Sequence, residues 1–280
     1  MNNLYLCSFA SSDLKKSVNR FVQQSKKINI YKEIKIFTYE DLSKKKKIQI
    51  NKFIEEKKKR LFGYACWKPE IILSYLKKIP EGSILQYSDI GCHLNKNGLK
   101  RLKEYIEIAN NKGILAFQYK DPNFTNNKSL KYQVYFEQEY TKNDLFSFFN
   151  LPIDSSIRTS EQVWSGTIFF KKNLLTLDLL NKWSEICDIN NLIDDSLSNS
   201  NNHKQFIEHR HDQSVFSILC KLNNIECLSA SECEWAEDKN GRYWDHLESF
   251  PILAKRDKKF NFIKRFFLRQ SKQLKRILGK

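Results

Sequence analysis

The sequence has no Cys-x-x-Cys pair, no apolar run long enough to cross a bilayer and no basic, apolar leader at its N-terminus. Its seven cysteines are scattered, which argues against a disulfide framework or a zinc knuckle and is typical of reduced thiols that fill a core as small apolar groups. Because a membrane span and a secretory signal are both missing, we expect the protein in the cytosol.

The sequence is rich in charged and in hydrophobic residues. The 280 residues carry a formal net charge of +16, and 41% of them are hydrophobic. This content supports a packed core, and the length suits one large α/β domain or two small ones. The positive charge has two interpretations, which are lysines solvated on the surface or contact with an acidic partner.

Apolar runs alternate with segments of helical periodicity. Buried strands are predicted at residues 4–9, 34–38, 84–88, 114–118, 164–170 and 225–228. Helices are predicted at residues 13–26, 41–58, from 69 onward, and at 97–111, 143–150, 174–189 and 211–223. The alternation predicts an α/β fold with a mostly parallel sheet and an irregular second half. A polar loop at residues 194–204 is long enough to form a mobile binding loop.

Residues 256–280 differ from everything before them, with ten Lys and Arg against one acid, Asp257. Their apolar side chains fall on one helical face: Ile263, Phe266, Phe267, Leu274, Ile277 and Leu278. We therefore divide the chain into a domain at residues 1–255 and a basic amphipathic helical tail at residues 256–280. Such a tail is predicted to lie on an anionic membrane surface, unless its apolar face packs on the domain's own core.

Two short segments carry the strongest chemical signals. Asp89 follows a predicted strand, and ligands of open α/β sheets sit beyond the carboxyl ends of the strands. That position makes Asp89 a candidate metal ligand, where a helix or turn cap is the structural alternative. The second segment, His-Arg-His-Asp-Gln at residues 209–213, stands at a predicted helix start directly after the polar loop.

Four motifs together resemble bacterial nucleotide-sugar glycosyltransferases with the GT-A fold, of the kind that builds lipopolysaccharide or capsule glycans. The motifs are Arg-Leu-Phe-Gly-Tyr-Ala-Cys-Trp-Lys-Pro at 60–69, Tyr-Ser-Asp-Ile-Gly-Cys-His at 87–93, Trp-Ser-Gly at 164–166 and the cluster at 209–213. The Asp-Gln pair is similar to that of the retaining galactosyltransferase and glycogenin group. The resemblance spans about residues 1–250 and implies a GT-A-like, Rossmann-type, mostly parallel mixed sheet, a UDP-linked hexose donor and a lipid-linked or lipopolysaccharide glycan acceptor.

The resemblance implies a divalent cation on the donor diphosphate, held by an Asp-x-Asp pair. Here Asp89 matches the first acid, but Gly91 takes the second position. Either His93 or a distant group such as the late His246 is predicted to complete the site, or the metal is held weakly. A surface histidine is the alternative for His246. A carboxylate combined with imidazole favours Mn²⁺ over Mg²⁺.

The resemblance also implies a donor site. Arg60 and Lys68 are predicted to counter phosphate charge, and Trp164 to stack on the sugar. The full predicted donor set is Ala10, Ser11, Arg60, Trp67, Lys68, Asp89, Trp164, Ser165, Gly166 and His211. The structural alternatives are a plain turn at residues 10–12, a core anchor for Trp67 and a strand bulge at residues 164–166.

Asp212 and Gln213 are the predicted catalytic residues. The resemblance places Asp212 on the sugar hydroxyls and Gln213 on the face where a nucleophile or an oxocarbenium stabiliser belongs. The alternative is a capped amphipathic helix that buries apolar side chains from Val215 onward.

The leading functional hypothesis is a cytoplasmic glycosyltransferase, peripheral on the inner face of the cell membrane. A basic nucleic-acid-binding protein is the second hypothesis, but the glycine–aromatic signatures of common RNA modules and zinc-finger spacings are missing. A third is an inactive member of the same fold, because Gly91 stands where a second acid is expected.

Overall fold

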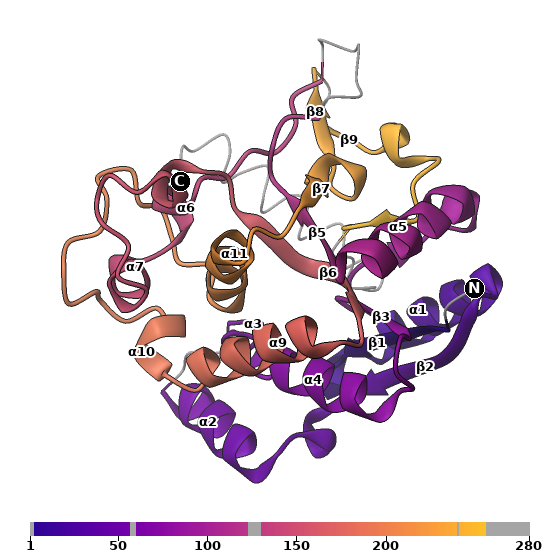
Figure 1. Ribbon diagram of the computed structural model, residues 1–280, viewed down its shortest axis with the longest axis horizontal. Coiled ribbons are helices and arrows are strands. Elements are labelled where there is room, and N and C mark those ends of the chain that lie inside the picture. Colours follow the sequence, from indigo (N-terminus) through magenta and orange to yellow (C-terminus); the bar gives the residue numbers. More distant parts are fainter. Residues whose placement is uncertain (1–2, 57–59, 123–129, 240, 256–280) are drawn as a thin grey trace, which may run out of the picture.

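A six-stranded sheet forms the centre of the molecule in a computed structural model that describes residues 3–56, 60–122, 130–239 and 241–255 (Figure 1). The strands follow the order β2-β1-β3-β6-β5-β7. Their bounds are β1 (Leu4–Phe9), β2 (Tyr31–Phe37), β3 (Ile84–Ser88), β5 (Ile114–Gln118), β6 (Val163–Lys171) and β7 (Cys227–Ser229). The predicted fold class, a mostly parallel mixed α/β sheet flanked by helices, is confirmed.

Strand β6 runs antiparallel to both of its neighbours, β3 and β5, whereas β1 pairs in parallel with β2 and β3, and β5 with β7. The register pairs Ser88 with Thr167, so the start of β6 lies against the end of β3. The Trp-Ser-Gly motif therefore meets Asp89 at the carboxyl edge of β3. The backbone N–H of Asp89 donates to the carbonyl of Gly166 over 2.8 Å.

Helices cover both faces of the sheet, because each presents an apolar face to it. The longer ones are α1 (Lys15–Ile28), α2 (Lys44–Glu55), α4 (Lys68–Lys78), α5 (Leu99–Lys112), α9 (Leu174–Cys187) and α11 (Asp212–Leu222). Residues of α4, α9 and α11 form the core on one face, and residues of α1 and α5 form the core on the other. Figure 1 shows α4 and α9 side by side.

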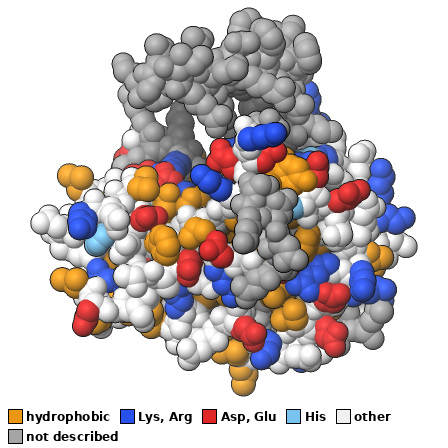
Figure 2. Space-filling view, turned by 90° about the horizontal axis from the view of Figure 1, so that it is seen from above, with side chains coloured by type: hydrophobic (Ala, Val, Ile, Leu, Met, Phe, Trp, Pro, Cys, Tyr) orange, Lys and Arg blue, Asp and Glu red, His pale blue; other side chains and the backbone are white. Residues whose placement is uncertain are grey.

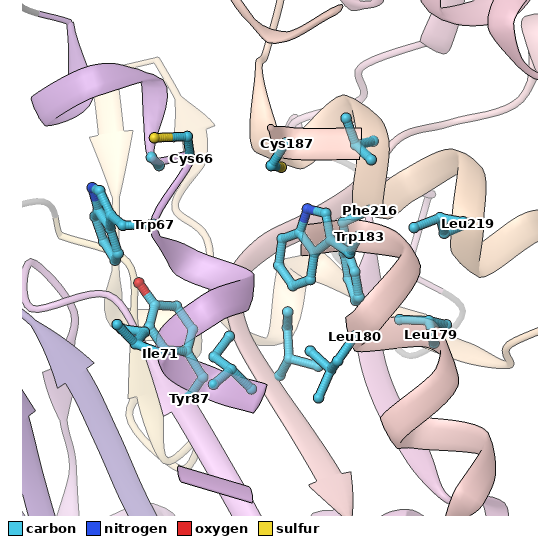
Figure 3. Packing of buried hydrophobic residues seen from close by; sticks show 14 of the residues in the cluster. Cys66, Trp67, Ile71, Tyr87, Leu179, Leu180, Trp183, Cys187, Phe216 and Leu219 are labelled. Carbon is cyan, nitrogen blue, oxygen red and sulfur yellow. The ribbon is translucent and has the colours of Figure 1, made fainter. Parts of the chain in front are cut away.

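The core beneath α9 and α11 fixes the start of α11. The rings of Trp183 and Phe216 lie 4.6 Å apart between their centroids, with Leu179 and Leu180 nearby (Figure 3). Trp183 is fully buried, and its indole N–H donates to the backbone carbonyl of Asp212 over 3.0 Å. The first turn of α11 is thus tied to the core by both packing and a hydrogen bond.

Several further elements are short, and most of them were not predicted from the sequence. They are β4 (His93–Leu94), β8 (Ala236–Asp238), β9 (Gly241–Tyr243) and β10 (Ile252–Leu253), with the single-turn or short helices α3 (Leu61–Tyr64), α6 (Glu137–Tyr140), α7 (Asn143–Phe148), α8 (Ser156–Thr159) and α10 (Asn190–Ile193). Only α7 coincides with a predicted helix. Two- and three-residue strands and single turns are too short to show a periodicity.

All seven cysteines are buried and free. Burial raises the pKa of the Cys227 thiol to about 12, and that of Cys66 also to about 12, so both stay protonated at neutral pH. The prediction that the cysteines are buried as small apolar core groups is confirmed.

The predicted basic tail, residues 256–280, lies outside the described residues, and its amphipathic helix stays a prediction. Among the helices of the described ranges, none combines the length and the apolar content that a bilayer crossing requires.

Candidate active site

A cavity of about 530 Å³ lies at the carboxyl edge of β1 and β3, where ligands of open α/β sheets bind. Its wall is formed by the turn after β1, the segment before α4, the end of β3, the start of β6 and the start of α11. The predicted site residues that line it are Ser11, Arg60, Trp67, Lys68, Asp89, Trp164, Ser165, His211, Asp212 and Gln213. Residues from four distant motifs are therefore brought to one cavity.

Lys68 forms the centre of the polar wall. Its side chain is buried at the first turn of α4, and its Nζ lies 2.8 Å from Asp212 Oδ2, 3.5 Å from Asp89 Oδ1 and 3.1 Å from Ser165 Oγ. The helix dipole disfavours an ammonium at this end of α4, and two carboxylates compensate for it. Burial opposes the charge of Lys68, but Asp212 and Asp89 outweigh burial and raise its pKa.

Two donors hold Asp212 at one of its carboxylate oxygens. Besides Lys68, its Oδ2 accepts from the hydroxyl of Ser165 over 3.0 Å, and its side chain is only 3% exposed. Burial raises the pKa of Asp212, and Lys68 opposes that shift. The carboxylate is thus fixed in the cavity wall rather than free to rotate. The predicted helix α11 is present as well, so the same residue both begins this helix and lines the cavity.

Asp89 is the more open of the two carboxylates, with 44% of its side chain exposed. Its Oδ1 accepts from the hydroxyl of Tyr87 over 2.6 Å and faces Lys68. The turn that follows is closed by the backbone, since the N–H of Cys92 donates to the carbonyl of Asp89. The side chain of Asp89 therefore faces the cavity instead of capping the turn.

The predicted three-residue metal set is not brought together. His93 does not line the cavity; it pairs with Leu253 of β10, and its Nδ1 lies 3.4 Å from the amide of Gln24. His246 binds the backbone carbonyls of Ser231 and Glu234 through Nε2. The assignment of both histidines as ligands beside Asp89 is corrected, because the turn after Asp89 leads the chain into β4 and away from the cavity.

More broadly, no three His, Cys, Asp or Glu side chains of the described residues are grouped as metal ligands. Asp89 is the member of the predicted set that remains at the cavity.

Aromatic side chains form another part of the wall. Trp67 stacks on Phe9 with ring centroids 3.8 Å apart and planes 23° from parallel, and its indole N–H donates to the carbonyl of Phe62. All three residues line the cavity, although Trp67 is only 6% exposed. Trp67 is thus both a core anchor and part of the cavity wall.

Packing explains why residue 166 is a glycine. A Cβ at this position would come within 2.2 Å of the indole of Trp164, so the glycine makes room for Trp164, which lines the cavity. Gly166 itself does not line the cavity. The predicted close approach of a sugar to Gly166 is corrected to a close approach of Trp164.

Ala10 also lies outside the lining. It is buried, and its N–H donates to the carbonyl of Phe37 over 2.9 Å. The neighbouring Ser11 does line the cavity, where its hydroxyl donates to Asp13.

The segment before α4 has an unusual backbone. Residues 61–65 all have positive φ, between +49° and +79°, in one left-handed turn that includes four non-glycine residues. Such residues each cost roughly 1–2 kcal/mol, so the surrounding contacts must hold the turn. Gly63 is required, since a Cβ there would meet Ile50 of α2 at 3.0 Å. The turn places Arg60 and Phe62 at the cavity.

Two arginines reach the cavity with acidic partners. Arg60 Nη2 lies 2.5 Å from Glu208 Oε2, and Arg210 Nε lies 2.9 Å from Glu208 Oε1. Arg210 also lies over the rings of Tyr135 and Tyr140, with its guanidinium carbon 4.9 and 4.5 Å from their centroids. Both guanidiniums are therefore positioned before any ligand is bound.

The two histidines of the cluster at 209–213 are buried and neutral. His209 Nε2 donates to the carbonyl of Leu192, and its Nδ1 accepts from the N–H of Lys142. Burial lowers the pKa of His209 to about 3 and that of His211 well below its ordinary value. His211 lines the cavity, whereas His209 is a structural hydrogen-bonding residue.

Some cavity residues carried no usable signal in the sequence. Phe9, Asp13, Tyr87 and Arg210 line the cavity or its polar wall without having been assigned a role. Phe9 and Tyr87 lie within strands, where an aromatic residue indicates burial only. Arg210 stands inside the cluster at residues 209–213, next to the predicted His211, and that position was the available hint.

Comparisons with known proteins do not assign a family. No protein-family model and no curated protein matches the sequence. Among solved structures, mouse xyloside xylosyltransferase 1 in its apo form is similar at 10% identity, over 83% of this chain and 87% of that one, with a TM-score of 0.39. S. aureus TarS 1–349 is similar at 15% identity over 82% of this chain, with a TM-score of 0.35, and 61% of its own length is covered. Likenesses this low carry no argument about this chain.

Proposed function

We propose that this protein is a glycosyltransferase that moves a sugar, a UDP-linked hexose, from a nucleotide donor onto a glycan acceptor of lipopolysaccharide or capsule synthesis. The observation that carries the proposal is the buried ammonium of Lys68 between the carboxylates of Asp89 and Asp212 at the cavity. These three residues belong to three of the four motifs that resemble nucleotide-sugar glycosyltransferases.

The cavity suits such a donor in size and composition. A volume of about 530 Å³ is within the range of small-molecule sites. Its wall joins stacked aromatic side chains, Phe9 and Trp67, with charged and hydroxyl groups. A nucleoside offers a flat apolar base, and its diphosphate sugar offers charges and hydroxyl groups for the polar wall.

Lys68 supports departure of the diphosphate. Breaking the bond between the anomeric carbon and the phosphate oxygen builds negative charge on the leaving group and positive charge on the sugar. An ammonium held in place by three oxygens costs no reorganisation as that charge develops. In this proposal Asp212 accepts hydrogen bonds from sugar hydroxyls, and both Asp212 and Gln213 line the cavity.

A divalent cation fits the cluster through Asp89. The cluster has two carboxylates for one ammonium, and the more open carboxylate faces the cavity. One carboxylate together with substrate phosphates is a common way to hold Mg²⁺. A cation there would neutralise charge on the leaving diphosphate. Neither His93 nor His246 joins this site, so the preference for Mn²⁺ that rested on imidazole loses its basis.

The surface does not favour the nucleic-acid hypothesis. On the face drawn in Figure 2, Lys and Arg side chains of the described residues lie interspersed with Asp and Glu. Several lysines are paired, including Lys47 with Glu40 and Lys112 with Glu226. Interspersed charges of both signs weaken the field that a phosphate backbone needs.

The proposal is tested by incubating the full chain with a panel of nucleotide sugars, with Mg²⁺ or Mn²⁺, and measuring donor hydrolysis and thermal shift. Stabilisation and hydrolysis selective for one donor support the proposal. Binding without turnover of any donor supports the inactive-scaffold hypothesis, and stabilisation by oligonucleotides alone supports the nucleic-acid hypothesis.

The membrane part of the proposal rests on the sequence of the tail. Each Lys or Arg within residues 256–280 is expected to contribute on the order of 1 kcal/mol of binding free energy near anionic head groups. Salt screens that attraction. Removing residues 261–280 is expected to abolish sedimentation with anionic vesicles and to leave turnover on a soluble acceptor unchanged. Equal vesicle binding by the truncated chain would contradict this part.

A further inference from the structure

The side-chain amide of Gln213 belongs to a buried hydrogen-bond chain that leads away from the cavity to Glu137. We infer that Glu137 and Gln162 are positioning residues, which fix the Gln213 amide so that its carbonyl oxygen, and not its NH₂ group, is presented on the cavity side. This inference rests on the proposed function. It adds that buried hydrogen bonds determine which end of the Gln213 amide, and so which partial charge, faces the sugar.

The hydrogen-bond chain begins at the carboxylate of Glu137, which only accepts hydrogen bonds. Glu137 has no exposed surface, and four donors surround it. They are the hydroxyls of Thr141 and Ser217, the amide of Gln162 and the ammonium of Lys221, which lies 2.6 Å from Oε1. A buried carboxylate with these partners cannot reverse its hydrogen-bonding role.

Gln162 takes its orientation from this carboxylate. Its Nε2 faces four acceptors, which are Glu137 Oε2, the carbonyl of Tyr140, and the hydroxyl oxygens of Thr141 and Ser214, at 3.0–3.3 Å. Both hydroxyl protons are already used, because Thr141 donates to Glu137 and Ser214 donates to the carbonyl of Tyr140. Turning the amide over would place its oxygen against a carboxylate and a carbonyl, which leaves a buried mismatch.

The orientation of Gln162 in turn determines the orientation of the Gln213 amide. With Gln162 Oε1 as an acceptor, Gln213 Nε2 must donate to it, and does so over 2.8 Å. Gln213 Oε1 is left on the other side of the amide, 3.5 Å from the backbone N–H of Ser165. Ser165 is the residue whose hydroxyl binds Asp212, so the oxygen lies beside the polar wall of the cavity.

The orientation matters because an amide is a dipole. A carbonyl oxygen carries partial negative charge and stabilises the positive charge that develops on the sugar as the diphosphate leaves. An NH₂ group at the same place would oppose that charge. Since both ends of the amide fill the same space, packing alone does not choose between them, and the buried carboxylate supplies the choice.

The kinetic test compares two Gln→Met substitutions. Gln162→Met removes the acceptor that holds Gln213, whereas Gln49→Met makes the same change at a buried glutamine of α2 that binds the carbonyl of Cys187. With the donor that the panel identifies, Gln162→Met is expected to lower kcat about 10- to 100-fold, the scale of one lost preorganised dipole, with donor KM nearly unchanged. Gln49→Met is expected to keep the wild-type kcat per folded molecule.

A double-variant cycle shows whether Gln162 acts through Gln213. In a Gln213→Met background, Gln162→Met is expected to have no further effect on kcat, because the amide that it orients is gone. Independent, multiplying losses would overturn the inference. So would a loss of melting temperature in Gln162→Met with an unchanged kcat, while the proposed function would stand.

NMR gives a readout that needs no turnover. The Gln213 side-chain amide protons, assigned by their loss in Gln213→Met, are expected to exchange slowly in the wild type and fast in Gln162→Met. Equal exchange rates in the two proteins would overturn the inference. Slow exchange in a protein that turns over no nucleotide sugar would instead count against the proposed function.

Discussion

The molecule contains two clusters of charged side chains with opposite ratios of cations to anions. In one, the ammonium of Lys68 lies between the carboxylates of Asp89 and Asp212. In the other, the carboxylate of Asp188 at the end of α9 lies between Lys45 and Lys46 of α2, at 2.6 and 2.5 Å. Each cluster has one charge more of one sign than of the other.

The clusters differ in where the surplus charge points. Lys45, the surplus ammonium of the Asp188 cluster, is 74% exposed to solvent, and the ion pairs of this cluster link α2 to the C-cap of α9. Asp89, the surplus carboxylate of the Lys68 cluster, faces the cavity. The comparison teaches that a buried lysine does not by itself indicate a functional site, and that the charge facing the cavity is what makes the Lys68 cluster the candidate.

The largest expected difference between the clusters concerns their aspartates. Asp89→Asn is expected to lower sugar transfer by on the order of 10²–10³-fold, because the leaving diphosphate loses the carboxylate that would hold its cation. Asp188→Asn, the matched change, is expected to leave turnover per folded molecule unchanged. Rates of both are measured over a titration of Mg²⁺ and of Mn²⁺, and wild-type activity of Asp89→Asn at limiting metal would contradict the assignment.

The lysines give the next comparison. Lys68→Met is expected to lower turnover about 10²-fold, since the ammonium that meets the leaving group is lost. Lys46→Met removes a charged hydrogen bond to Asp188 and is expected to cost about 1.5–3 kcal/mol of unfolding free energy, with normal turnover. Urea unfolding and kinetics on the same preparations separate the two effects. A loss of turnover in both variants would erase the distinction between the clusters.

A substitution of Asp212 tests whether this carboxylate of the Lys68 cluster acts chiefly in the transition state. Asp212→Asn keeps the shape and the hydrogen bond from Ser165 but removes the charge. We expect kcat to fall more than tenfold with donor affinity changed less, because the carboxylate acts chiefly on the developing sugar cation. If calorimetry shows that donor affinity falls as much as kcat, Asp212 contributes uniform binding instead.

The last comparison concerns stability and not turnover, and it lies beside the cavity, at His209. Its pKa is about 3 in the folded protein against 6.5 ordinarily, because the ring is buried with Nδ1 already accepting a hydrogen bond. The unfolded chain takes up the proton first, so stability present above pH 6.5 is lost as pH falls toward 3. The loss is about 1.4 kcal/mol for each pH unit within that window.

The measurement is the unfolding free energy from pH 7 to pH 5. His209→Gln is expected to flatten this dependence by one proton, and the matched His203→Gln, at an exposed position, is expected to leave it unchanged. An identical slope in His209→Gln would show that other groups cause the acid sensitivity.

The sequence by itself determined the alternation of strands and helices, and with it the fold class. Apolar periodicity predicts burial locally, so strands β1, β3, β5 and β6 appear where they were expected. The position of Asp89 at a strand end also followed from the sequence, because in an open sheet that edge is where ligands bind. Asp89 does line the cavity.

Only the tertiary structure decided which side chains meet. The antiparallel direction of β6 places Ser165 beside Lys68 and Asp89, and strand direction leaves no trace in a pattern of burial. A tight turn carries His93 away from Asp89, although His93 follows the acid by only four positions. The orientation of Gln213 depends on Glu137, which lies 76 positions earlier in the sequence. Periodicity reports how one segment is buried, whereas partners from distant segments are chosen by packing and by the pairing of buried polar groups.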